Sequence, residues 1–109
     1  MEMDESEPIH LIQNAKHQNA LGYIDYALKK MIEREITSDQ VEEALNSNSA
    51  EILRNYPQAG RPSPECLILG WHDSGRRPLH VLVAYPEPYV VTAYEPTLPK
   101  WRTPRERGE

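Results

Sequence analysis

Hydrophobic and polar residues alternate with two different periods along this chain, and the period changes near residue 50. In the first half, apolar positions recur every three or four residues with charged positions between them, which is typical of an amphipathic helix. We expect this helix to span roughly Ala20 to Glu35. Its buried stripe is expected to contain Leu21, Ile24, Leu28, Met31 and Ile32.

A second helix is expected directly after the first. Thr37 offers a hydroxyl at the N-cap position, and Gln40 follows three residues later, which is the pattern of a capping box. The helix should end near Asn46, because the Asn and Ser side chains that follow compete for backbone hydrogen bonds. Its apolar stripe consists of Val41, Ala44 and Leu45.

In the second half of the chain the period shortens to two, as expected for strands. The turn residues Asp73 to Gly75 and Pro86 to Pro88 separate the apolar runs. Two helices followed by an antiparallel meander predict an α+β fold, with two N-terminal helices packed on a four-stranded, mainly antiparallel sheet. The expected strands are Ala50–Tyr56, Cys66–Trp71, Leu79–Tyr85 and Tyr89–Tyr94.

The last two strands bring a histidine and a tyrosine together. The simplest antiparallel register pairs His80 with Tyr94, and their Cβ atoms would then lie about 5 Å apart on the exposed face of the sheet. The same register pairs Leu82 with Thr92 and Ala84 with Val90. The face toward the helices would hold Leu79, Val81, Val83, Tyr85, Tyr89, Val91 and Ala93.

His80 and Tyr94 are the candidate catalytic residues, because imidazole transfers protons near neutral pH and a phenol can donate to a developing anion. The alternative is a packed aromatic pair with a structural role. Trp101 could stack on a base or anchor the tail to the sheet edge. The candidates for RNA or phosphate binding are Lys30, Arg34, Arg61, Arg77 and Trp101.

Composition narrows the function only slightly. The chain has 109 residues, 39% of them apolar, which suits one domain with a modest core. We expect a disordered acidic leader at 1–8, a single domain at 9–101 and a basic flexible tail at 102–109. The net charge of −5 counts against a nucleic-acid partner, and only the basic tail favours one.

The remaining sequence features predict a chain without special groups. The single cysteine, Cys66, lies in an apolar run and is expected to be buried and inert. No His or Cys pair has the tight spacing of a metal site, so neither a metal nor a cofactor is expected. No run of apolar residues suggests a signal peptide or a membrane span, and we expect a cytoplasmic protein with no membrane partner.

A further observation concerns five runs of residues, which are Met31 to Leu45, Cys-Leu-Ile-Leu-Gly at 66–70, Pro-Leu-His-Val at 78–81, Val-Thr-Ala-Tyr-Glu-Pro at 91–96 and Lys-Trp at 100–101. Together these runs resemble a bacterial family, the domain of unknown function numbered 4258. The resemblance covers about Ile24 to Trp101. It implies an α+β fold similar to the RelE and ParE toxins, which include ribonucleases and gyrase poisons.

The first helix departs from the family pattern. That pattern reads Ser-x-His-Ala-x-x-Arg-Met-x-x-Arg; here Tyr26 replaces the His, Lys30 replaces the first Arg, and Arg34 is retained. His80, Tyr94 and Glu95 match the later motifs.

Two hypotheses follow from the residues and the resemblance. The first is a toxin-like, metal-independent endoribonuclease or RNA-binding protein. Its partners would be RNA or the ribosome and a cognate antitoxin, and it could form a homodimer. The second is a non-catalytic protein-interaction module built on a degenerate toxin fold. The replaced His and the net acidity favour this alternative.

Overall fold

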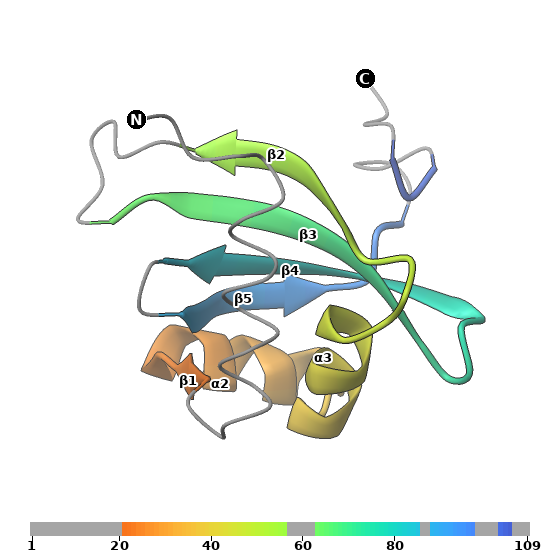
Figure 1. Cartoon of the computed structure of the whole chain (residues 1–109). Helices are drawn as coiled ribbons and strands as arrows, with labels where there is room; N and C mark the ends of the chain where they lie inside the picture. The colour runs from red at the N-terminus through yellow and green to blue at the C-terminus, as the bar shows by residue number, and fades with distance from the viewer. Residues whose placement is uncertain (1–20, 57–62, 86–87, 98–102, 106–109) are drawn as a thin grey trace, which may run out of the picture.

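The computed structural model describes residues 21–56, 63–85, 88–97 and 103–105 (Figure 1). Two helices and five strands are present in this part of the chain, so the predicted α+β class is confirmed. Both helices precede the antiparallel strands along the chain. The elements are β1 (Gly22–Tyr23), α2 (Asp25–Glu33), α3 (Ser38–Leu45), β2 (Glu51–Tyr56), β3 (Glu65–His72), β4 (Arg77–Ala84) and β5 (Tyr89–Tyr94).

The sheet is mixed, with the strand order β1-β5-β4-β3-β2. Strands β2 to β5 form the expected antiparallel meander, whereas β1 lies parallel to β5. The prediction of four strands missed β1. The predicted first helix includes its residues, but the amide of Gly22 donates to Pro88 O at 3.2 Å and that of Ile24 to Val90 O at 3.2 Å. Because these bonds keep Gly22 to Ile24 extended along the edge of β5, helix α2 begins only at Asp25.

Helix α2 buries a narrower stripe than its periodicity suggests. Ala27 and Met31, four residues apart, are buried against β5 and the core. Leu28 and Ile32 were expected to be buried, but 43% and 79% of their surfaces are exposed. A helix of nine residues that packs on one strand covers only one row of its side chains, and these two residues lie in the next row.

Helix α3 begins as the sequence predicts. The Thr37 hydroxyl accepts from the Gln40 amide at 3.1 Å, and the Gln40 side-chain oxygen accepts from the Thr37 amide at 3.0 Å. This reciprocal capping box satisfies two amides that the first turn leaves without helical partners. The expected stripe of Val41, Ala44 and Leu45 is fully buried.

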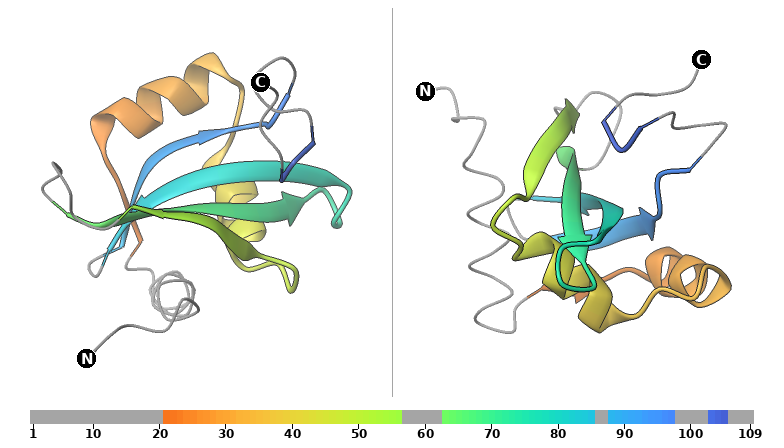
Figure 2. Two further views of the ribbon diagram at one scale, coloured as in Figure 1. Left: turned by 90° about the horizontal axis from the view of Figure 1, so that it is seen from above. Right: turned by 90° about the vertical axis from the view of Figure 1, so that its right-hand side faces the viewer.

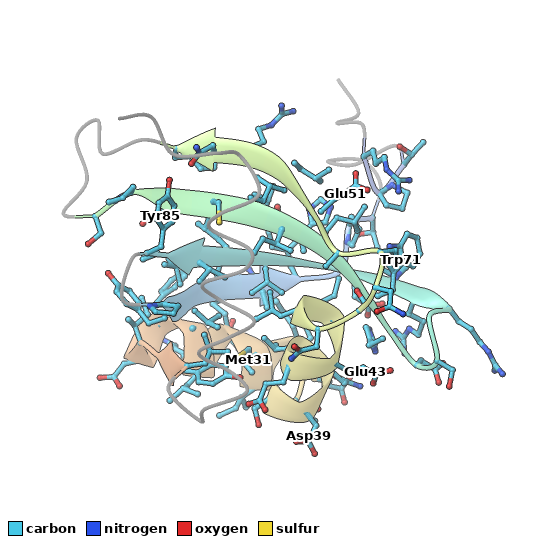
Figure 3. All side chains as sticks on the ribbon, viewed as in Figure 1. Met31, Asp39, Glu43, Glu51, Trp71 and Tyr85 are labelled. Carbon is cyan, nitrogen blue, oxygen red and sulfur yellow. The ribbon has the colours of Figure 1, made fainter. Side chains whose placement is uncertain are left out.

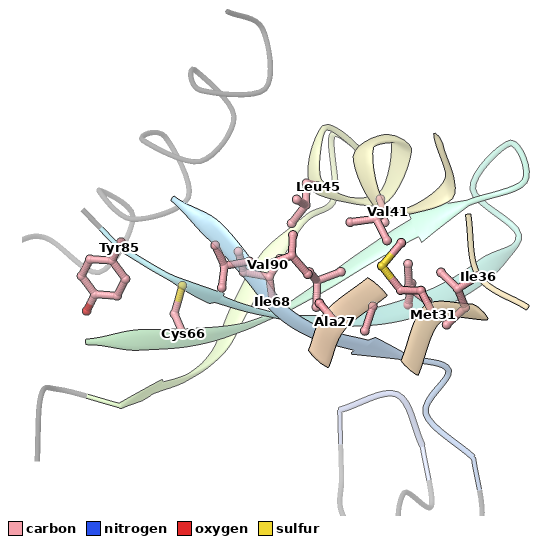
Figure 4. Packing of buried hydrophobic residues seen from close by; sticks show 14 residues of the cluster. Ala27, Met31, Ile36, Val41, Leu45, Cys66, Ile68, Tyr85 and Val90 are labelled. Carbon is pink, nitrogen blue, oxygen red and sulfur yellow. The ribbon is translucent and has the colours of Figure 1, made fainter. Parts of the chain in front are cut away.

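The core lies between the helices and one face of the sheet (Figure 4). Helix α3 packs very close to β3 at Gly70, where an added Cβ would stand 2.1 Å from Ala44 O. At one end of the core, Tyr85 packs beside Cys66, and its hydroxyl donates to the Asn55 side chain at 2.7 Å. Glycine at position 70 therefore sets the distance between α3 and the sheet.

A bulge in β5 changes the predicted faces. Thr92 pairs with Leu82 as expected, but Val90 pairs with Val83. Val91 is thus an extra residue on β5, as in a β-bulge. The predicted pairing of Ala84 with Val90 is wrong, and so is the placement of Val91 in the core, because Val90 is the fully buried residue.

The face of the sheet away from the helices is also covered at one end. The right-hand view of Figure 2 shows Thr103–Arg105 on the side of the sheet opposite α2 and α3. We call these three residues the strap. The face beneath was expected to be exposed, yet Leu69 and His80 have no exposed surface.

Candidate functional site

His80 and Tyr94 are cross-strand partners, as the sequence predicts. His80 on β4 pairs directly with Tyr94 on β5. Their ring centroids are 5.2 Å apart, and the ring planes are inclined at 62° in an edge-to-face arrangement. The bulge in β5 lies on the other side of Thr92, so it leaves this pair in the predicted register.

The hydrogen bonds of His80 define its tautomer. Its Nε2 atom lies 2.7 Å from the carbonyl oxygen of Pro104, and its Nδ1 atom lies 3.3 Å from the Tyr94 hydroxyl. A carbonyl oxygen can only accept, so Nε2 carries the proton and donates it to Pro104. In the neutral ring, Nδ1 then accepts from the phenol.

The surroundings of His80 favour this neutral ring. Burial lowers the pKa of His80 below its ordinary value of 6.5, and the bond to the Pro104 carbonyl opposes this shift only in part. At neutral pH the imidazole is therefore uncharged, with a lone pair on Nδ1 directed at Tyr94. It can accept a proton at Nδ1 and release one from Nε2.

Arg34 brings a positive charge to the same tyrosine. It follows the last turn of α2, and its Nη1 atom donates to Thr92 Oγ1 at 3.0 Å and to Ala93 O at 2.9 Å. The guanidinium carbon lies 5.9 Å from the centre of the Tyr94 ring. We call His80, Tyr94, Arg34 and Thr92 the His80 cluster.

Two other predicted phosphate ligands are engaged elsewhere. The Arg77 guanidinium donates to both carboxylate oxygens of Glu95, at 2.8 and 2.7 Å. Lys30 bonds Glu33 at 3.4 Å and lies over the Tyr26 ring. The structure thus brings Arg34 to the tyrosine and pairs the other two cations with carboxylates. Predicted ligands Arg61 and Trp101 lie outside the described residues.

The strap supplies site residues that the sequence did not reveal. Besides the Pro104 carbonyl, Arg105 donates from Nε and Nη2 to the two carboxylate oxygens of Glu51, at 2.9 and 3.1 Å. Figure 3 shows Glu51 on the side of the molecule where the strap lies. Register places Glu51 beside Leu69, and Leu69 beside His80, in one row across three strands.

Little in the sequence could have predicted these contacts. Glu51 is an acidic residue at the start of an edge strand, and Arg105 is one of several basic residues near the end of the chain. Their pairing spans 54 residues. Strand patterning fixes positions within the sheet, but it carries no information on where a segment without periodicity docks.

The remaining chemical groups lie outside the cluster. Cys66 is buried as predicted, and burial raises the pKa of its thiol to about 12, so the reactive thiolate is disfavoured. An open hollow of about 470 Å³ shares no residue with the cluster. It is lined by Glu43, Asn46, Ser47, Asn48, Ser49, Trp71 and Gly75.

Neither a metal-binding group nor a membrane-spanning helix is found among the residues that the structure describes. Among these residues, no three His, Cys, Asp or Glu side chains are grouped so that they could hold a metal ion. In the same part of the chain, no helix has the length and apolar character needed to span a membrane.

The geometry defines an α+β domain whose sheet carries a histidine, tyrosine and arginine cluster. Residues 25–95 match the model of one protein family, described as a domain of unknown function (DUF4258). The match covers more than half of the chain, and the chain therefore belongs to this family. Neither the curated proteins nor the solved structures contain a match.

Proposed function

We propose that this chain is a metal-independent, RNA-cleaving domain whose active site is the His80 cluster. The observation that carries the proposal is the position of Tyr94, which lies between the imidazole of His80 and the guanidinium of Arg34. Phosphodiester cleavage by the neighbouring 2′-hydroxyl needs a proton acceptor, a proton donor and a positive charge near the phosphate, and these three side chains can supply them.

The hydrogen bonds support a proton relay through Tyr94. The 2′-oxygen of RNA forms a bond to phosphorus while the bond from phosphorus to the 5′-oxygen breaks, which gives a 2′,3′-cyclic phosphate and a 5′-hydroxyl. The 2′-hydroxyl proton passes to the Tyr94 oxygen as the phenol proton passes to Nδ1 of His80. Nε2 gives its proton to the 5′-oxygen, so the ring changes tautomer and stays neutral.

Arg34 suits the phosphate-binding role better than the other cations. Its two described hydrogen bonds both use Nη1, and an arginine has further N–H donors on Nη2 and Nε. Its side of the cluster is exposed, whereas His80 is buried behind the tyrosine. Charge that develops on the phosphoryl oxygens would meet this guanidinium.

The cellular setting is part of the same proposal. The family resemblance implies a fold similar to the RelE and ParE toxins, and that implied likeness suggests RNA or the ribosome as target, a cognate antitoxin as partner and the cytoplasm as location. The retained Arg34 and the pairing of His80 with Tyr94 support a toxin-related origin.

A non-catalytic interaction module is the second candidate. Two observations favour it: His80 has no exposed surface, and Arg77 is paired with Glu95. A buried histidine whose two nitrogens both have partners is a common structural element. In this reading the strand face and its strap would present a surface to a partner protein.

Cleavage of a single-stranded RNA oligomer in EDTA distinguishes the candidates. We expect the wild type to release products with a 2′,3′-cyclic phosphate, and Tyr94→Phe to lose about a hundredfold in rate because the relay loses its hydroxyl. Tyr89→Phe is the matched control, since it removes a phenol oxygen from the same strand, outside the cluster, and should keep the rate.

Two results would reject the catalytic assignment. If Tyr94→Phe and His80→Gln both cleave RNA as fast as the wild type, the cluster is not the active site. If RNA is cleaved neither by the wild type nor by a variant such as Arg105→Ala, which loses the ion pair that holds the strap, the interaction module is the better description.

A further inference from the structure

The strap occupies the position that the proposed reaction needs. Pro104 O accepts the Nε2 proton of His80 at 2.7 Å, and the proposed relay delivers that proton to the 5′-oxygen of RNA. A carbonyl oxygen and a leaving-group oxygen cannot both accept it. While the strap is docked, Nδ1 of His80 can still accept the proton of Tyr94. Nε2 cannot donate to RNA, because Pro104 O already accepts its proton.

Among the described residues, contacts to two strands hold the strap. Pro104 bonds His80 on β4, and Arg105 bonds Glu51 on β2. Leu69 on β3 lies between Glu51 and His80 in the same row, so the strap crosses three strands. Within the strap, the Arg105 amide donates to Thr103 Oγ1 at 3.2 Å and fixes the turn that presents both groups.

The contacts differ in strength and accessibility. The side chains of Arg105 and Glu51 are 55% and 40% exposed, so salt screens their attraction and competing ions can reach them. The bond to His80 is sheltered, but it is a single bond to a neutral ring. A strap held in this way can open without unfolding the sheet.

We propose that Thr103–Arg105 is an autoinhibitory strap that closes the His80 cluster to RNA, and that loss of the Arg105–Glu51 ion pair opens it. The inference rests on the proposed function, because an inhibitory role requires an activity to inhibit. An anion that binds Arg105, or a partner that binds Arg105 or Glu51, would break the ion pair and activate the domain.

The test uses full-length variants and two independent readouts. Arg105→Ala and Glu51→Gln each remove the ion pair from one side. Arg54→Ala is the matched control, since it removes a positive charge from an exposed residue of β2 outside the strap. NMR titration of the His80 ring reports the docking of the strap, and cleavage of an RNA oligomer reports activity.

We expect both strap variants to raise the pKa of His80 toward its ordinary value. They should also speed RNA cleavage about two- to fivefold, because an exposed ion pair changes an equilibrium constant, here that of strap docking, by about this factor. Arg54→Ala should match the wild type in both readouts. Raising the NaCl concentration should shift the His80 titration of the wild type toward that of Arg105→Ala.

The two readouts separate the possible failures. If the His80 titration is unchanged in both strap variants, the docking of the strap does not depend on the ion pair. That result would overturn the proposal that loss of the ion pair opens the strap. A shifted titration with unchanged cleavage would overturn autoinhibition and leave the catalytic site standing. A shifted titration with no cleavage by any protein would overturn the proposed function, and the inhibitory role with it.

Discussion

At the residue scale, the environment of His80 decides what it can do. On an exposed sheet face an imidazole would be charged or neutral depending on the pH. Under the strap it is buried and neutral, and each ring nitrogen has a defined partner. Strand alternation predicted the contact with Tyr94 correctly, but it could not predict the burial, which depends on a segment 24 residues away.

The neutral state of His80 predicts a pH dependence of stability. Its pKa is lower in the folded than in the unfolded protein, where it is near 6.5, so the unfolded state binds the proton first as the pH falls. The contribution of neutral His80 to stability is therefore complete above pH 6.5. It is lost as the pH falls from 6.5 through the lower, folded pKa, by at most about 1.4 kcal/mol per pH unit.

Urea denaturation from about pH 7.5 to about pH 5.5 measures this effect. The free energy of unfolding of the wild type should fall more steeply with decreasing pH than that of His80→Gln, which has no proton to bind. Because other titrating groups are common to both proteins, they cancel in the difference. Equal slopes for the two proteins would show that His80 is not held neutral by the fold.

At the element scale, the sequence predicted what local patterns encode. The capping box of α3, the start of β5 at Tyr89 and the antiparallel meander all follow from neighbouring residues. It failed where tertiary pairing overrides a local pattern. Leu21 and Ile24 have helical spacing relative to α2, so the predicted helix includes Gly22 and Tyr23, yet these two residues pair with the edge of β5 and form β1.

The contact between α3 and β3 predicts a large effect for one substitution. Gly70→Ala would place a Cβ 2.1 Å from the carbonyl oxygen of Ala44 and 2.5 Å from its carbon. Both atoms belong to the helix backbone, which cannot rotate away, so α3 must shift. We expect a loss of about 3 kcal/mol in the free energy of unfolding, measured by urea denaturation.

Gly22→Ala is the matched control for this substitution. Its added Cβ would lie 3.5 Å from the Cβ of Tyr89, an ordinary contact, and Gly22 is exposed. The change in stability should stay within about 0.5 kcal/mol. If Gly70→Ala is equally mild, α3 does not pack on β3 as closely as the structure has it.

At the scale of the whole molecule, charge is distributed unfavourably for nucleic-acid binding. The net charge is −5, and the first eight residues contain four acidic residues and no basic ones. Arg77 and Arg105 are paired with carboxylates in the described part of the chain. Within the described part of the chain, Arg34 is the cation beside the proposed active site, and it is bonded to neutral oxygens of Thr92 and Ala93.

This distribution predicts weak RNA binding with a shallow dependence on salt. Each phosphate neutralised on a single strand contributes a slope of about −0.7 to the logarithm of affinity against the logarithm of salt concentration. A single contact with Arg34 should therefore give a slope near −0.7. Fluorescence anisotropy with a labelled 2′-O-methyl RNA oligomer, which cannot be cleaved, measures it between about 50 and about 200 mM NaCl.

Two variants connect that slope to the site. Arg34→Gln should weaken binding and bring the slope close to zero, because the one phosphate contact is lost. Arg54→Gln removes the same charge from an exposed position on β2, far along the sheet order from β5, and should keep both affinity and slope. A slope of about −3 or steeper that persists in Arg34→Gln would mean that RNA binds through several other basic residues. RNA recognition would then belong to a different surface, and the His80 cluster would lose its proposed substrate.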